Sequence, residues 1–316
     1  GIATFAALTT GDSNTAVGKS ALTANTTGAS NTAVGCGALA ANTTANNNVA
    51  VGMCAMLATT TGANNTAVGF SALDTNTTGC ENVAVGRDTM FTSTTSCRSV
   101  GVGYRALKAT TTGSFNVGVG YHSLTTNTTG HSNAALGNNS LEANTTGTNN
   151  TALGCASLAS NTTAAGNTAV GLSALLSNTT GANNVGLGLL SLAANTTAAD
   201  NTAVGACAMC KNTEGHSNVA VGHCALFTNT GGDTNTAVGH HALKLNTTAA
   251  DNTAVGRNAL CTTTTGCVNT AMGSSAMQLN TTGDNNVAIG AGALYDNTTA
   301  DNNTAVGTNS LANNTT

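Results

Sequence analysis

A unit of 17 residues recurs along this chain without insertion, starting at Asn14, Asn31 and Asn48 and continuing to Asn303. Counted from its first asparagine as position 1, the unit reads N-T-A-V-G-x-x-A-L-x-x-N-T-T-G-x-x and starts eighteen times. Position 1 is Asn in every copy except the one that starts at Ser99. A fixed period of this kind is typical of solenoids, in which each repeat forms one coil and packs on its neighbours.

The unit is too short for a helix, a turn and a second helix, and its Gly, Asn and Thr content favours strands and turns. We therefore predict an all-β fold, a parallel β-solenoid (β-roll) of about 18 coils of 17 residues with two short strands per coil. The prediction covers residues 1–316 as a single uninterrupted solenoid that starts and ends mid-repeat. Positions 4 and 9 are always aliphatic or Met in these copies, and we expect these two columns to form the core.

Position 5 is glycine in every copy, which predicts a backbone with positive φ or a close approach of two backbones. The first five turn glycines of this column are Gly18, Gly35, Gly52, Gly69 and Gly86.

Position 12 is Asn in fourteen copies, and most of these asparagines begin an N-T-T sequence. Stacked coils would place the amides about 4.8 Å apart, which suits a hydrogen-bonded ladder. The same N-T-T triplets are acceptors for N-linked glycans in secreted proteins, so two interpretations remain open, with the ladder favoured. The ladder or glycan candidates are Asn25, Asn42, Asn76, Asn127, Asn144, Asn161, Asn178, Asn195, Asn246, Asn280, Asn297 and Asn314.

Of the ten cysteines, six lie as pairs in the same or adjacent columns of neighbouring coils, where coil spacing matches the Cα separation of a disulfide. Cys261 and Cys267 flank one turn of a single coil, and Cys155 and Cys210 are left over. The predicted bridges join Cys36 to Cys54, Cys80 to Cys97, Cys207 to Cys224, and Cys261 to Cys267. Disulfides would indicate an oxidising, extracellular location, whereas free thiols at tolerant surface positions are the alternative.

Composition argues against several classes of function. Charged residues make up 6% of the chain, and its Lys and Arg are scattered singly, so binding to nucleic acid is not expected. No apolar stretch is long enough for a membrane-spanning helix. We find no arrangement of residues that is typical of a catalytic site, and we predict no enzyme, no cofactor and no metal site. Cys207, Cys224 and His241 share a column, with His223 and His240 beside them, but the spacing matches no zinc pattern.

Positions 3 and 8 admit only small residues, although positions 6, 7, 10, 11, 16 and 17 accept charged and large ones. Either the coil is thin, or one face packs against another copy of the chain. The second interpretation predicts lateral self-association, most simply as a trimer, and coils could also stack end to end into a filament.

The repeat N-T-A-V-G-x-x-A-L-x-x-N-T-T-G resembles repeats of bacterial and phage fibre proteins along the whole chain. More loosely, it resembles the heads of trimeric autotransporter adhesins, whose V-A-I-G-type motifs build a parallel β-roll from a shorter repeat. These resemblances imply a trimeric fibre exposed on a cell or virion surface and used for attachment. We therefore expect a structural extracellular filament or fibre shaft, with or without covalent glycans, that supports adhesion or a matrix. The alternatives are an attachment module of adhesin or tail-fibre type and, less favoured, an ice-binding solenoid.

Overall fold

The computed structural model describes residues 4–315, which divide into two compact units. Within the described residues, the first unit comprises 4–156 and 160–163, and the second comprises 157–159 and 164–315. Gly1 and Thr316, which the repeat places in partial coils, lie outside the described residues. The organisation of the chain as one uninterrupted solenoid stays a prediction.

Each unit carries nine strands of three residues, one from each coil. The strands of the first unit are β1 (Thr15–Val17), β2 (Thr32–Val34), β3 (Val49–Val51), β4 (Thr66–Val68), β5 (Val83–Val85), β6 (Val100–Val102), β7 (Val117–Val119), β8 (Ala134–Leu136) and β9 (Thr151–Leu153). Those of the second unit are β10 (Thr168–Val170), β11 (Val185–Leu187), β12 (Thr202–Val204), β13 (Val219–Val221), β14 (Thr236–Val238), β15 (Thr253–Val255), β16 (Thr270–Met272), β17 (Val287–Ile289) and β18 (Thr304–Val306).

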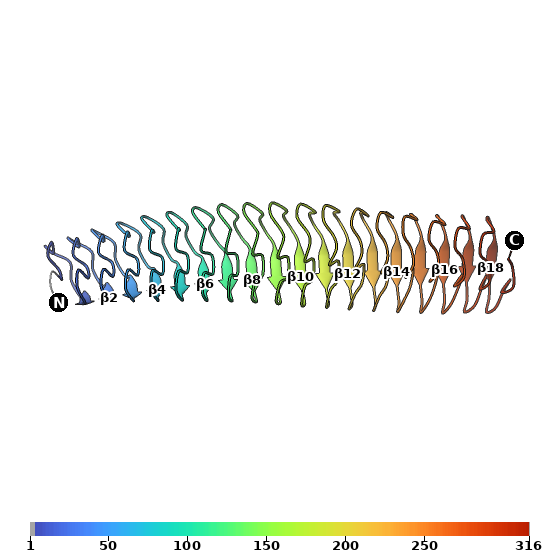
Figure 1. The fold of residues 1–316 in the computed structure, drawn as a ribbon, viewed down its shortest axis with the longest axis horizontal. Coiled ribbons are helices and arrows are strands. Elements are labelled where there is room, and N and C mark those ends of the chain that lie inside the picture. The colour runs from blue at the N-terminus through green and yellow to red at the C-terminus, as the bar shows by residue number, and fades with distance from the viewer. Residues whose placement is uncertain (1–3, 316) are drawn as a thin grey trace. The chain divides into compact units, whose positions relative to one another are not determined.

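Within each unit, successive strands pair in parallel and in register, so that each residue faces the same column of the next coil. Thr15 pairs with Thr32 and Val17 with Val34 in the first unit, and the second unit repeats the pattern from β10 to β18. Figure 1 shows the strands lying side by side along one side of the coils. The predicted fold class, an all-β parallel solenoid of about 17 residues per turn, is confirmed. No helix that could cross a membrane occurs among the described residues.

The expectation of two strands per coil is corrected, because the described coils contain one strand each. In the coil that starts at Asn31, Leu39 has φ of +49° and the preceding coil has φ of +58° at both Ser20 and Ser30. A strand cannot continue through such left-handed residues, so the chain turns repeatedly instead. Hydrogen bonds between coils nevertheless continue here, as from Leu22 N to Ala38 O at 3.1 Å and from Thr26 N to Thr43 O at 2.9 Å.

The core also differs from the expected one. Positions 3, 8 and 9 point inward, and in one coil the corresponding Ala33, Ala38 and Leu39 are fully buried. Position 4 points outward, and Val34 remains 37% exposed. Strand residues alternate between two faces, so an inward position 3 forces positions 2 and 4 outward. The left-handed backbone at position 9 then lets two neighbouring positions, 8 and 9, face the same interior.

Candidate functional site

One regular surface of each unit is the outward side of the strands, formed by positions 2 and 4, which we call the strand face. Position 4 contributes Val, Leu, Ile or Met in every coil, and position 2 contributes Thr or Val in every coil except that of Ala134. No residue of either column carries a charge. Val221 is 37% exposed, Ile289 40% and Met272 44%, so these side chains cover the strands without being covered themselves.

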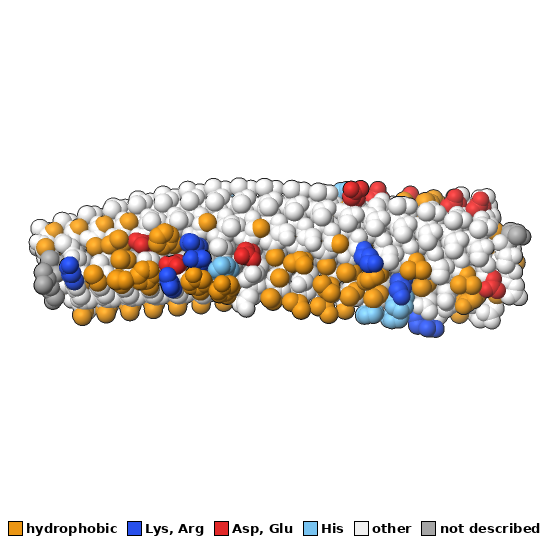
Figure 2. Space-filling view, in the orientation of Figure 1, with side chains coloured by type: hydrophobic (Ala, Val, Ile, Leu, Met, Phe, Trp, Pro, Cys, Tyr) orange, Lys and Arg blue, Asp and Glu red, His pale blue; other side chains and the backbone are white. Residues whose placement is uncertain are grey.

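The strand face is regular as well as apolar. Parallel pairing repeats each side chain at the strand spacing of about 4.8 Å, and positions 2 and 4 lie roughly 6.6 Å apart along a strand. In Figure 2, hydrophobic side chains gather in the lower part of each unit, whereas white side chains and backbone predominate along the upper edge, where the second unit also carries acidic side chains. Within each unit the result is two in-register rows of uncharged side chains, most of them β-branched.

The asparagines of position 12 lie inside the coils and form side-chain ladders. Asn144 Nδ2 donates to Asn127 Oδ1 at 2.8 Å and to Gly147 O at 3.1 Å, and Asn161 Nδ2 donates to Asn144 Oδ1 at 2.9 Å. Eleven of the twelve candidate asparagines are fully buried, and Asn314 is half-buried. A fully buried, hydrogen-bonded amide is not accessible to a glycosylating enzyme, so the folded coil and N-glycosylation exclude one another at the eleven buried residues.

The asparagines of position 1 form a second buried column with a different bonding pattern. Asn31 Oδ1 accepts from Asn48 N at 3.0 Å, while Asn31 Nδ2 donates to Ala45 O at 2.8 Å. At the one exception, Ser99 Oγ accepts from Asn116 N at 3.1 Å, so the hydroxyl supplies the same acceptor. Both columns therefore hold successive coils together through polar groups that water does not reach.

The turn glycines Gly18, Gly35, Gly52, Gly69 and Gly86 have φ between +131° and +142°. A Cβ atom built on Gly18 would lie 2.5 Å from the carbonyl oxygen of Gly35 in the next coil. Both the backbone conformation and the close contact therefore exclude a side chain, and this column fixes the spacing of the coils at the end of each strand.

All ten cysteines are free thiols, so none of the four predicted bridges is formed in this structure. Cys80 Sγ and Cys97 Sγ lie 2.7 Å apart, in contact but not bonded. Hydrogen bonding to Cys97, followed by burial, raises the pKa of the Cys80 thiol to about 11. Cys267 Sγ instead donates to Thr265 O of its own turn at 3.3 Å, and burial raises the pKa of Cys261. Cys80 and Cys97, which share one column of neighbouring coils, are therefore in contact. Cys261 and Cys267 lie within one coil, and Cys267 bonds to the backbone of its own turn instead.

We expect Cys80 and Cys97 to form a disulfide readily when the folded chain is treated with diamide, because their sulfurs are already in contact. Trypsin cuts after Arg87 and Arg98, so the bridge would appear in mass spectra as a linked peptide pair that dithiothreitol separates. Exposed Cys155 serves as the control and should remain alkylatable under the same conditions. Absence of the linked pair after complete oxidant consumption would contradict the contact.

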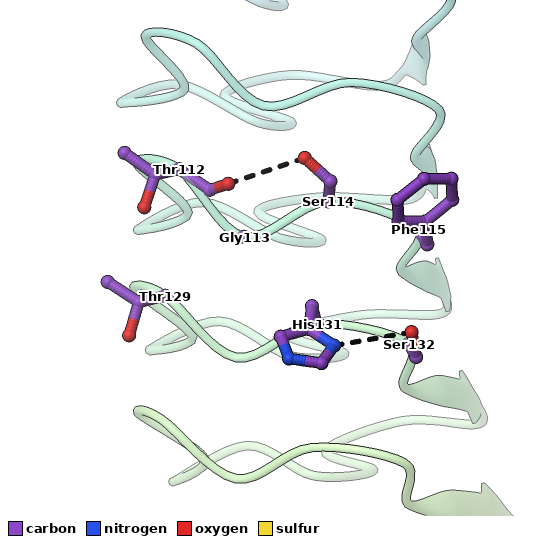
Figure 3. A pocket seen from close by; sticks show the side chains of 7 residues that line it. All are labelled: Thr112, Gly113, Ser114, Phe115, Thr129, His131 and Ser132. Atoms are coloured by element: carbon purple, nitrogen blue, oxygen red, sulfur yellow. Dashed lines mark hydrogen bonds between the residues drawn. The ribbon is translucent and has the colours of Figure 1, made fainter.

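A shallow pocket of about 430 Å³ lies between two neighbouring turns of the first unit and is drawn in Figure 3. It is lined by Thr112, Gly113, Ser114, Phe115, Thr129, His131 and Ser132. Its His131 Nδ1 lies 3.3 Å from Ser132 Oγ, but both side chains are exposed and adjacent in sequence. The contact therefore joins neighbours on an open surface and supplies no enclosed environment that would activate a nucleophile.

One feature escaped the sequence interpretation. The outward direction of position 4 was hidden because an aliphatic column resembles a core column whichever way it points. The three histidines that the sequence columns place side by side, His223, His240 and His241, gather on one surface of the second unit. Comparison with protein-family models and with curated proteins gives no match for this chain.

Proposed function

We propose that this chain is a structural fibre protein whose strand face packs against other copies of the chain. The observation that carries the proposal is the uncharged, half-exposed row of aliphatic and Thr side chains that every coil contributes. Large exposed apolar surfaces are uncommon on monomeric proteins and typically mark interaction sites. The resemblance to bacterial and phage fibre repeats supports the same function and supports a location outside the cell or on a virion surface.

The energetics favour a contact shared by many coils. Burying the remaining exposed part of one position 4 side chain contributes on the order of 0.5–1 kcal/mol, at about 25 cal/mol per Å². Nine coils in a unit repeat this contribution. The sum is comparable with the roughly 4–15 kcal/mol of translational and rotational entropy that association costs. Association should therefore depend on the whole row and weaken sharply when charges interrupt it.

The test places three glutamates in the row by combining Val204→Glu, Val221→Glu and Val238→Glu, in consecutive coils of the second unit. Sedimentation velocity should show concentration-dependent oligomers for the unmodified chain and monomers for this variant, because three charges would have to be buried in the contact.

A matched control adds the same charge on another surface. Thr180→Glu, Thr197→Glu and Thr248→Glu change exposed residues at position 14, where Glu214 already occurs, and should leave association unchanged. An unmodified chain that stays monomeric at all concentrations, or a control that dissociates equally, would contradict the proposal.

Ice binding is the second candidate, favoured by the placement of threonines on the strands. Position 2 is Thr in ten of the eighteen coils, and these hydroxyl-bearing side chains share one column beside the aliphatic side chains of position 4. Thermal hysteresis measured on the same proteins separates the candidates. A monomeric chain that depresses the freezing point, and loses this effect in the triple Val→Glu variant, would favour ice binding over fibre assembly.

A further inference from the structure

Three imidazole rings meet on the surface of the second unit. His223 and His240 occupy position 6 of neighbouring coils, and His241 follows at position 7. One nitrogen from each ring lies within 4.8 Å of the other two. The ring centroids of His223 and His240 are 5.4 Å apart, and those of His240 and His241 are 3.7 Å apart.

The coil geometry produces this arrangement. Parallel pairing of β13 with β14 places residues separated by 17 positions directly beside one another, which brings His240 next to His223. His241 has φ of +60°, and its backbone N donates to His223 O at 3.2 Å. The backbone on which the rings are mounted is therefore fixed by hydrogen bonds between coils, while the exposed His223 and His240 side chains remain free to turn.

The surroundings contain both favourable and unfavourable groups for a cation. Cys224 Sγ lies 3.7 Å from His223 Nε2 and could add a sulfur ligand. Lys244 is close enough to act on His241, and Arg257 follows His240 in the position 6 column of the next coil. Burial, followed by His240, Lys244 and His223, lowers the pKa of His241. Metal binding requires each histidine ligand in its neutral imidazole form.

We propose that His223, His240 and His241 form a surface site for a divalent transition-metal ion such as Zn²⁺ or Cu²⁺. Imidazole nitrogens suit these ions, whereas Ca²⁺ and Mg²⁺ prefer oxygen ligands. In a tetrahedral zinc site the ligand nitrogens lie about 3.4 Å apart, given Zn–N distances of about 2.0–2.1 Å. The nitrogen atoms of the three histidines lie within 4.8 Å of one another, and rotation of the exposed His223 and His240 side chains would shorten these distances to that value. Water or the Cys224 thiolate would supply the fourth ligand.

The proposal accounts for why the sequence spacing matches no zinc pattern. Zinc motifs on a finger or helix place ligands a few residues apart, whereas here the separation of His223 and His240 equals the coil period. The site is independent of the strand face, since its residues lie outside positions 2 and 4. Failure of either proposal leaves the other standing.

The test is isothermal titration of the reduced full chain with ZnCl₂ and, separately, with CuCl₂. We expect one equivalent of metal per chain and a dissociation constant that rises at least about tenfold in His240→Ala. His131→Ala replaces another exposed histidine, in the first unit, and should bind within about twofold of the unmodified chain. Circular dichroism of each variant establishes that the solenoid is intact.

A second readout identifies the ligands. Electron paramagnetic resonance of the Cu²⁺ complex should show coupling to several nitrogens, reduced in number in His240→Ala and unchanged in His131→Ala. Retention of binding in Cys224→Ser supports the histidine set. The proposal is overturned if neither metal binds, or if His240→Ala and His241→Ala both bind as tightly as the unmodified chain.

Discussion

Replacing Gly205 by Ala should destabilise the second unit by on the order of 3 kcal/mol or more, which is a large fraction of the stability of a typical domain. Gly205 has φ of +133°, a region that is essentially restricted to glycine. A Cβ atom there would lie 2.6 Å from the Gly222 carbonyl oxygen and 2.7 Å from its carbonyl carbon. Backbone atoms of the next coil cannot move aside without breaking the hydrogen bonds between the parallel strands. Small local shifts therefore cannot relieve the steric strain.

Urea denaturation followed by circular dichroism measures this loss, with Gly231→Ala as the matched control. Gly231 lies in the same unit and has no atom within 4 Å of an added Cβ. Its replacement should change the free energy of unfolding by no more than about 0.5 kcal/mol. Equal effects of the two substitutions would show that position 5 requires glycine for a reason other than backbone conformation and close contact.

Replacing Asn144 by Asp should cost the first unit about 3–5 kcal/mol at neutral pH. The carboxylate would lose the two donations that Asn144 Nδ2 makes, to Asn127 Oδ1 and Gly147 O, and would face both oxygens with a negative charge. Burial raises the pKa of such a carboxyl above its unfolded value of about 3.9. Stability is then greatest below the unfolded pKa and falls as the pH rises through the folded pKa, so the deficit should shrink in acid.

Thermal unfolding of the variant between pH 3 and pH 8 tests this expectation, and Asn46→Asp provides the control. Asn46 is exposed, and its Oδ1 accepts from Ala29 N at 2.7 Å, a role that Asp233 Oδ1 already performs for His216 N. The Asn46→Asp variant should keep the unmodified stability within about 0.5 kcal/mol. A deficit in Asn144→Asp that stays constant across this pH range would argue against a buried carboxylate.

The period and the fold class could be predicted because both depend on repetition, which is visible in one sequence. The invariant glycine at position 5 also allowed its backbone to be predicted, since only a positive φ or a close approach of two backbones excludes every side chain. The alternation of strand residues, in contrast, does not show which of the two faces points into the core. A column of Val such as Val34 fits an interior or a self-association surface equally well, and only the burial of Ala33 decides between them.

The missing second strand has a different cause. Left-handed backbone usually selects Gly, Asn or Asp, yet position 9 places Leu22 and Leu39 at φ of +50° and +49°. Such a conformation costs about 1–2 kcal/mol per residue, and complete burial of a Leu side chain returns roughly 1.5–3 kcal/mol. Local propensity is thus overridden by packing at this position. The grouping of the three histidines was visible from the repeat columns, whereas the distances between their rings depend on how separate coils stack and could not be predicted.

The self-matching of the buried columns has a genetic consequence. Asn127, Asn144 and Asn161 each bond to the same residue type one coil away, and interior alanines such as Ala33 and Ala50 likewise pair with their equivalents. A recombination event that deletes or duplicates the codons of one coil therefore joins two coil surfaces that already fit. No compensating substitutions are needed to restore the packing. Chain length in such a protein is free to change in whole coils, whereas a shift of a single codon would misalign every column beyond it.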